Sequence, residues 1–305
     1  MKILLATDGS SNAREAAEFL RNLQISEPFE LTILSVCYDP ETTGPEVVQP
    51  WFPEWLAQQQ AAYEKHHREL EALLADRCSS VSRQVREGHA ARVILNEAES
   101  NQSDLIVMGA QGHSAVGRVV LGSVSDRIAT HATCSVLIVH PNPDDKANTS
   151  KGSPALAIAY DSSPASCEAT AEMTELGLSS ETPLTLVSIA PIFDYTLGEG
   201  LTTIAVENEE AVYENMNRAI KEACETLRPA FPQVKGIVEK GRHIGDTLVA
   251  TAEREQCDLL VIGDAEHSLL HDWILGSTTK FVLRHTSCSI WISRHHRRSS
   301  AEENH

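Results

Sequence analysis

The feature that most constrains the fold of this chain is an internal repeat. Five segments of the first half return in the same order in the second half, 153 residues later at first and 154 residues later from the third segment on. A repeat of this length predicts two domains of one fold rather than one large domain. The paired segments are ILLATDGS (3–10) with LAIAYDSS (156–163), LTILSV (31–36) with LTLVSI (184–189), SDLIVMGAQG (103–112) with CDLLVIGDAE (257–266), LGS (121–123) with LGS (275–277), and CSVLIVH with CSIWISR.

The segment between the two copies has the composition of a linker. HPNPDDKANTSKGSP (140–154) is rich in Pro, Asn, Asp and Ser and poor in large apolar residues. We therefore predict domains at residues 1–143 and 152–294. Residues 295–305 show no hydrophobic periodicity, so we expect a disordered tail there.

Short apolar runs alternate with longer amphipathic stretches within each copy. Strands that alternate with helices predict an α/β fold with a doubly wound, parallel sheet, and continuous apolar strands need cover on both faces. In the first copy we expect strands at 2–7, 31–37, 81–86, 104–109 and 134–139, with helices near 11–22, 55–77, 90–101 and 123–131. In the second copy we expect strands near 155–160, 184–189, 234–239, 258–263 and 288–293.

Charge and cysteine content restrict the class of partner. The chain has a formal net charge of −18, which argues against nonspecific binding to nucleic acid or to an anionic membrane surface. No apolar run approaches the roughly 18 residues of a membrane span, and the apolar part of MKILLATDGS is too short for a signal peptide. The seven cysteines are scattered without a CxxC pair, which favours reduced thiols and a cytoplasmic protein.

A glycine-spaced stretch, GAQGHSAVGRVVLGS (109–123), follows the apolar run that ends at Met108. Gly122 and Ser123 stand immediately before a helical segment, and a helix N-terminus presents unpaired N–H groups that suit a phosphate. Glycines also let the backbone approach an anion closely. The alternative is that Ser123 and Ser125 only cap the helix.

Two further positions fall at the carboxyl ends of predicted strands, where open parallel sheets bind ligands. Asp8 ends the first strand and can accept hydrogen bonds from ribose hydroxyls or an adenine amine; alternatively, it caps a turn or helix in TDGSS. Val36 ends the second strand and can form one wall of a base pocket; alternatively, it is ordinary core.

Other motifs carry less information. The chain has neither GxxxxGK[ST] nor a GxGxxG after the first strand, so it lacks a P-loop and a dinucleotide fingerprint. His66 and His67 are expected on the solvated face of a long helix. The proline- and tryptophan-rich stretch at 38–56 is either a packed surface loop or a lid near the strand ends.

Each half resembles a domain of the universal stress protein family, and the chain looks like a tandem member. The family motif is G-x2-G-x9-G-[ST], and Gly109, Gly112, Gly122 and Ser123 fit every position of it. The resemblance implies five parallel strands in the order 3-2-1-4-5, an arrangement like that of the adenine nucleotide alpha hydrolases. It also implies ATP, with or without Mg²⁺, at the tips of strands 1 and 4.

The resemblance also implies a role for each matching residue. Gly112, Gly122 and Ser123 would hold phosphates, and Val124 would offer its backbone N–H. The adenosine side would be lined by Thr7, Asp8, Val36, Met108 and Gly109.

The second half departs from the motif. It keeps Gly263, Gly276 and Ser277, but Glu266 replaces the second glycine, and Asp264 and Asp272 fall in the same loop. Carboxylates near a triphosphate oppose its binding. We therefore expect one competent nucleotide site and one degenerate site per chain.

The function implied is that of an ATP-binding stress-response regulator, with an unidentified regulatory protein as partner. A homodimer through the apolar fifth strands or through helix surfaces is also expected, since such edges invite pairing. Three alternatives stay open: a slow ATPase or autophosphorylating enzyme with Asp8 as the candidate to orient Mg²⁺ or water, a scaffold indifferent to nucleotide, and a flavin-binding relative.

Overall fold

The protein divides into two compact units, and each is described by itself. In the computed structural model, one unit lies within Met1–Lys146 and the other within Ala147–His296. The structure describes residues 1–37, 52–111, 121–141, 153–192, 199–264 and 275–294.

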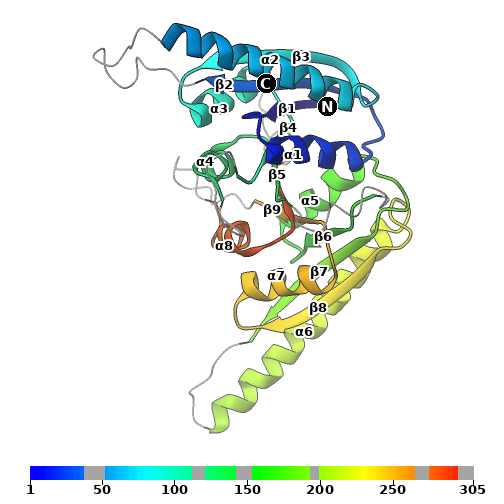
Figure 1. Ribbon diagram of the computed structural model, residues 1–305. Coiled ribbons are helices and arrows are strands. Elements are labelled where there is room, and N and C mark those ends of the chain that lie inside the picture. The colour runs from blue at the N-terminus through cyan, green and yellow to red at the C-terminus, as the bar shows by residue number, and fades with distance from the viewer. Residues whose placement is uncertain (38–51, 112–120, 142–152, 193–198, 265–274, 295–305) are drawn as a thin grey trace, which may run out of the picture. The chain divides into compact units, whose positions relative to one another are not determined.

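The first unit is an α/β sandwich around one parallel sheet (Figure 1). Its strands lie in the order β3-β2-β1-β4-β5, and every pair of neighbours is parallel. The elements are β1 (Lys2–Ala6), α1 (Ser11–Asn22), β2 (Phe29–Cys37), α2 (Phe52–Leu74), β3 (Cys78–Glu87), α3 (Ala90–Ser100), β4 (Leu105–Gly109), α4 (Ser123–His131) and β5 (Ser135–Val139).

The second unit repeats this topology. Its strands lie in the order β8-β7-β6-β9-β10, which is the same order as in the first unit, and its neighbours are again parallel. The elements are β6 (Leu156–Ala159), α5 (Pro164–Glu175), β7 (Leu184–Pro191), α6 (Glu199–Leu227), β8 (Lys235–Gly241), α7 (Ile244–Arg254), β9 (Leu259–Gly263), α8 (Ser277–His285) and β10 (Ser289–Ser293).

The predicted fold class is confirmed. Each unit has five parallel strands in the order 3-2-1-4-5. The largest shifts are of three residues: α2 spans Phe52–Leu74 instead of 55–77, and the third strand of the first unit begins at Cys78 instead of residue 81 because its first residues pair with β2 from Phe29 onward. Most of this strand is exposed or half-buried, so its sequence lacks the apolar run that identified the inner strands.

Helix α1 shows how local sequence fixes an element beside the sheet. Ser10 is its N-cap and accepts a hydrogen bond from the backbone N–H of Ala13 at 3.3 Å, which satisfies one of the free donors of the first turn. The buried side chains follow the helical period and form one apolar stripe. They are Ala13, Ala16, Ala17 and Leu20.

The order of the strands places helices on both faces of the sheet. The chain moves outward from β1 to β3 and then returns to β4 and β5, so right-handed crossovers put α1 and α2 on one face and α3 and α4 on the other. The direction reverses between β1 and β4. The carboxyl ends of these two central strands are therefore where an open parallel sheet of this kind can receive a ligand.

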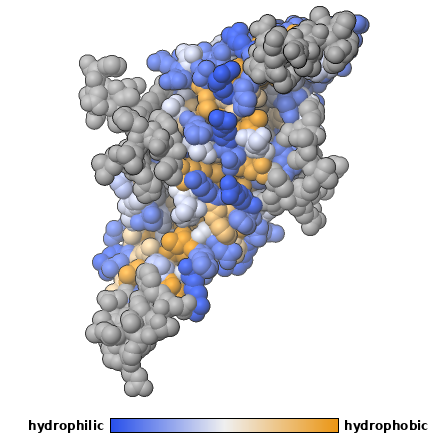
Figure 2. Space-filling view, turned by 90° about the vertical axis from the view of Figure 1, so that its left-hand side faces the viewer, coloured by the Kyte–Doolittle hydropathy of each residue, from blue (hydrophilic) through white to orange (hydrophobic). Residues whose placement is uncertain are grey.

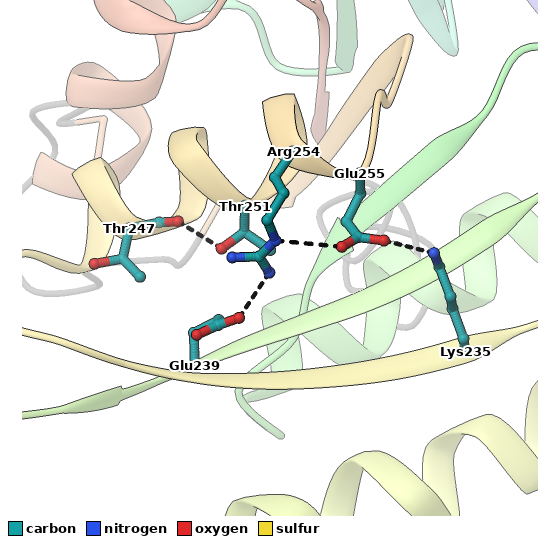
Figure 3. Close-up of polar contacts among 6 residues, drawn as sticks. All are labelled: Lys235, Glu239, Thr247, Thr251, Arg254 and Glu255. Carbon is teal, nitrogen blue, oxygen red and sulfur yellow. Dashed lines mark hydrogen bonds and ion pairs between the residues drawn. The ribbon is translucent and has the colours of Figure 1, made fainter.

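The described surface is largely polar. The face drawn in Figure 2 carries mainly hydrophilic side chains, with hydrophobic ones in smaller groups between them. On the second unit, α7 is joined to β8 by exposed ion pairs (Figure 3): Arg254 bonds Glu239 at 2.6 Å, and Lys235 bonds Glu255 at 2.6 Å. Exposed pairs of this kind contribute little to stability. None of the helices described is both long enough and apolar enough to cross a lipid bilayer.

The glycine that ends the fourth strand of each unit has a packing role. A Cβ on Gly109 would lie 3.1 Å from the backbone carbonyl carbon and oxygen of Asn12 in α1. A Cβ on Gly263 would collide with the backbone carbonyl of Ala165 in α5. Both glycines therefore allow the helix that follows the first strand to pack closely against the fourth strand.

We predict that Gly263→Ser lowers the free energy of unfolding of the second unit by about 1–3 kcal/mol or more, because its Cβ would push against main chain that cannot rotate away. Gly276→Ser is the matched control in the same unit. Its Cβ would meet nothing closer than 3.7 Å, and serine is a good residue for the N-cap position that Gly276 holds. Urea unfolding measures both. Equal stability of the two variants would contradict this packing role.

Candidate functional site

The loop after β1 is held in one conformation by its own polar groups. The N–H of Thr7 donates to the carbonyl of Leu34 at 2.9 Å, which extends the pairing of β1 with β2. Asp8 accepts from the N–H of Ser10 through Oδ1 at 3.0 Å, and Gly9 has a positive φ of 78°. The turn role weighed for Asp8 is therefore present. Thr7 is buried and Asp8 is half-buried.

The end of β4 and the start of α4 are joined by two hydrogen bonds. The N–H of Gly122 donates to the carbonyl of Ala110 at 2.8 Å, and Oγ of Ser125 donates to the carbonyl of Gly109 at 3.0 Å. Neither serine caps the helix. Gly122 is the N-cap, no side chain caps this end, and Ser123 is exposed. The alternative in which Ser123 and Ser125 serve only as caps is wrong.

The backbone angle does not require a glycine at position 122, although an added Cβ would make a tight contact with the main chain. Its φ is −66°, which any residue adopts, and the nearest neighbour of an added Cβ would be the carbonyl oxygen of Ala110 at 3.3 Å. A glycine at this position adds no side chain beside the first backbone N–H groups of α4. Those N–H groups carry the partial positive charge of a helix N-terminus.

Three more of the predicted residues lie at the same edge of the sheet. Val36 is half-buried near the end of β2, Met108 is buried at the end of β4, and Val124 is half-buried in the first turn of α4. Gly112 lies outside the described residues, as do residues 38–51 of the stretch expected to be a surface loop or a lid. The described site residues are Thr7, Asp8, Val36, Met108, Gly109, Gly122, Ser123 and Val124, from the ends of β1, β2 and β4 and the start of α4.

Helix α2 adds contacts that the sequence reading missed. Nε2 of His66 lies 3.0 Å from Oγ1 of Thr7, and Nε2 of His67 lies 2.8 Å from Oγ of Ser35. His67 is only 1% exposed, so the expectation of a solvated histidine pair is wrong. Two adjacent polar residues suggest a solvent-exposed position, but this part of α2 covers the ends of β1 and β2. The ring of Tyr63 also lies 3.7 Å from where a Cβ of Gly9 would be.

The environment of α2 keeps these groups neutral. Burial lowers the pKa of His67 to about 4, with smaller contributions from His66 and Arg83. Burial also lowers the pKa of His66, and Arg14 adds to this while Glu69 and Asp8 oppose it. Burial raises the pKa of the Tyr63 hydroxyl, and the charge of Asp8 adds to that.

Comparison with known proteins identifies the family. The family model of the universal stress protein family matches residues 1–140 and again residues 155–294. The chain belongs to this family. A universal stress protein of Thermus aquaticus, described as lying in the QAH/OAS sulfhydrylase 3′ region, is 35% identical over 141 residues, which cover 45% of this chain and 96% of that protein.

Solved structures agree on the fold. The crystal structure of a universal stress protein from Archaeoglobus fulgidus matches with a TM-score of 0.67 and 17% identity, covering 96% of each chain. At this identity the likeness shows the fold alone. A universal stress protein family member from Arabidopsis thaliana, solved with AMP bound, matches 49% of this chain and 97% of its own with 17% identity and a TM-score of 0.36.

The second universal stress protein unit keeps the turn but changes its side chains. Asp161 accepts from the N–H of Ser163 at 3.0 Å, as Asp8 does from Ser10, and Ser163 caps α5. Burial alone would raise the pKa of Asp161, but hydrogen bonds from Ser163 and Ser166 bring it below its ordinary value. Tyr160 stands where the first unit has Thr7, and α6 contains no histidine.

The structure also corrects the role expected of Asp264. This carboxylate is 2% exposed, and its Oδ2 lies 2.8 Å from Nε of Arg294, which is 1% exposed. The charge of Asp264 is therefore compensated inside the unit and does not confront a ligand. At the equivalent positions the first unit has Ala110 and the buried, neutral His140, whose pKa burial lowers to about 4.

Two further acidic residues of that loop, Glu266 and Asp272, lie outside the described residues. Over the part of the chain that is described, no three His, Cys, Asp or Glu side chains are grouped so that they could hold a metal ion.

We predict that Asp264→Ala lowers the free energy of unfolding of the second unit by about 3–5 kcal/mol, because it leaves the Arg294 cation buried without its carboxylate. The double variant Asp264→Ala, Arg294→His reproduces the pair found in the first unit and is expected to recover most of this loss. Urea unfolding followed by circular dichroism measures both. A double variant no more stable than the single one would contradict the pairing.

We predict that stability falls with pH on the acid side of neutrality. A histidine whose pKa is lowered from 6.5 to about 4 on folding binds its proton more readily when the chain is unfolded. Its stabilising effect is therefore complete above pH 6.5 and is lost as the pH falls toward 4, by roughly 3 kcal/mol. His140 acts in the same range.

Unfolding free energies measured between pH 7.5 and 4.5 test this dependence. His67→Gln is expected to lose less stability over that range than the wild type. His131→Gln, at an exposed position of α4, serves as the control and should follow the wild type. Identical slopes for His67→Gln and wild type would refute the assignment.

Proposed function

We propose that this universal stress protein binds an adenine nucleotide, foremost ATP with or without Mg²⁺, in its first unit. The site is the edge where β1, β2 and β4 end and α4 begins. The bound nucleotide biases the conformation of the unit and so its binding to a regulatory protein or to a second copy of the chain. This is the role of a stress-response regulator rather than of an enzyme with rapid turnover.

One observation carries the proposal most strongly. The N-terminus of α4 has a glycine N-cap and no side-chain cap, and it is attached by hydrogen bonds to the end of β4 beside the Thr7–Asp8 loop. A phosphate supplies the acceptors that such a helix end otherwise lacks. The reversal of strand order between β1 and β4 is also where ligands bind in open parallel sheets.

The two ends of the ligand are assigned to different residues. We propose that Gly112, Gly122, Ser123 and the N–H of Val124 contact phosphate. The adenosine part would lie along Thr7, Asp8, Val36, Met108 and Gly109. The contribution of Gly109 is mainly to shape the site, because its missing Cβ is required by α1 whether or not a nucleotide is bound.

We further propose domains at residues 1–143 and 152–294, with a competent site only in the first. This asymmetry rests on Tyr160 in place of Thr7, on the absence of histidine from α6 and on Glu266 in the motif. Asp264 does not contribute to it, because its charge is paired with Arg294.

Titration of the full-length chain with labelled ATP is predicted to give one site per chain. Ser123→Ala should weaken ATP binding by about tenfold, the effect expected for one lost hydrogen bond to a charged group. The equivalent change in the second unit, Ser277→Ala, is the matched control and should leave affinity unchanged. Two equal sites, or equal effects of the two variants, would overturn the asymmetry.

The same preparation separates the other functions. Mass spectrometry of nucleotide that copurifies with the protein identifies the ligand, and sedimentation velocity with and without ATP reports on self-association. Release of phosphate that stops in Asp8→Ala while ATP still binds would favour an enzyme. Failure to bind any adenine nucleotide would favour a scaffold.

A further inference from the structure

Helix α2 holds the loop after β1 from two sides through its adjacent histidines. His66 reaches the side chain of Thr7, with Nε2 and Oγ1 3.0 Å apart. His67 reaches the main chain of the same residue through Ser35, which lies 2.8 Å from both Nε2 of His67 and the carbonyl oxygen of Thr7. The N–H of Thr7 also donates to the carbonyl of Leu34. The N–H, the carbonyl and the hydroxyl of Thr7 are therefore each held by a neighbouring residue.

The network determines which ring nitrogen of His67 carries its proton. Oγ of Ser35 donates to the carbonyl of Thr7, so it accepts from His67, which must carry its proton on Nε2. Oγ1 of Thr7 accepts from the N–H of Gly9 at 3.2 Å. The same oxygen keeps a second lone pair, so toward Nε2 of His66 it can donate or accept; it donates when the imidazole is neutral and carries its proton on Nδ1.

The surroundings of His66 come from several elements. Asp8 in the loop and Glu69 on α2 favour its protonation, whereas Arg14 on α1 and burial oppose it. Tyr63 lies one turn earlier on α2, against Gly9, and His67 follows on the same helix beside Arg83 of β3. Protonated His66 would no longer accept from Thr7 and would attract the carboxylate of Asp8.

We propose that His66 is a positioning residue for the adenosine side of the site, and that ligand binding there requires it to be neutral. This inference rests on the proposed function of the first unit. His66 acts through Thr7 and Asp8: as a neutral acceptor it holds the hydroxyl of Thr7, and without a positive charge it does not draw the carboxylate of Asp8 toward itself. Acidification therefore weakens binding by reorganising the loop after β1.

The second unit supplies an internal comparison. Oγ of Ser188 donates to the carbonyl of Tyr160, so the main-chain half of the arrangement is retained. The side-chain half is absent, because α6 has no histidine and Tyr160 has no hydroxyl at the position of Oγ1 of Thr7. The hydroxyl of Tyr160 instead lies 4.0 Å from Sγ of Cys167. The two histidines are thus a feature of the unit that keeps the whole glycine motif.

The test measures adenosine and ATP binding to the full-length protein by calorimetry between pH 7.5 and 5.5. Adenosine has no group that titrates in this range, so its pH profile reports on the protein. Wild-type affinity for adenosine should fall as the pH is lowered, by less than about tenfold because the pKa of His66 is already below its ordinary value. His66→Gln, whose amide oxygen still accepts from Thr7, should bind as wild type does at pH 7.5 and lose the pH dependence.

His66→Leu and Lys65→Gln complete the design. His66→Leu removes the acceptor and should weaken adenosine and ATP by the same factor at every pH, whereas Ser123→Ala should weaken ATP alone. Lys65→Gln, on the exposed face of α2, should retain the wild-type pH profile. Thermal melts confirm that each variant is folded.

The outcomes separate the two proposals. If the wild type binds ATP and adenosine at pH 7.5 but His66→Gln keeps the same pH profile, this inference fails and the proposed function stands. If the wild type binds neither ligand at pH 7.5, the proposed function fails and this inference fails with it.

Discussion

The arrangement of each unit depends on one close contact between main chains. The helix after the first strand packs so tightly on the end of the fourth strand that a Cβ would lie only 3.1 Å from the main chain at Gly109 and would collide with it at Gly263. In the first unit this contact is extended by the side chain of Asn12, whose Nδ2 donates to the carbonyl of Gln111 at 3.1 Å. Because of this contact, the loop after β1 and the turn leading to α4 lie at the same edge of the sheet.

This contact divides the glycine motif into two physical parts. The first glycine of each copy is required by packing, and its presence in both units carries no information about a ligand. Gly122 has an ordinary φ, and an added Cβ would make one tight contact, 3.3 Å from the carbonyl oxygen of Ala110, so packing constrains it less than it constrains Gly263. A motif match therefore supports ligand binding only through those positions that the fold itself leaves unconstrained.

The fold was largely predictable from the sequence, whereas much of the site was not. The repeat and the buried runs of β1 and β4 identify the strands, since a residue buried on both faces of a sheet must be apolar. The roles of His67 and Asp264 could not be read in this way. Both are polar residues in polar stretches, and their burial depends on partners, Ser35 and Arg294, that lie about 30 residues away in the sequence. A comparison of the two copies could have indicated the Asp264–Arg294 pair. Both residues differ between the copies, since the first copy has Ala110 and His140 at the equivalent positions.

The two units differ in the side chains at the ends of their fourth and fifth strands. In the second unit a buried carboxylate and guanidinium at the ends of β9 and β10 form an ion pair. In the first unit the corresponding pair is an alanine and a neutral histidine, and α2 contributes two more neutral imidazoles at the neighbouring strand ends. Fixed opposite charges there would compete with a charged ligand for hydrogen bonds, whereas neutral groups at the strand ends would not. On this argument the difference between the copies lies in the strand ends around the glycine motif as much as in the motif itself.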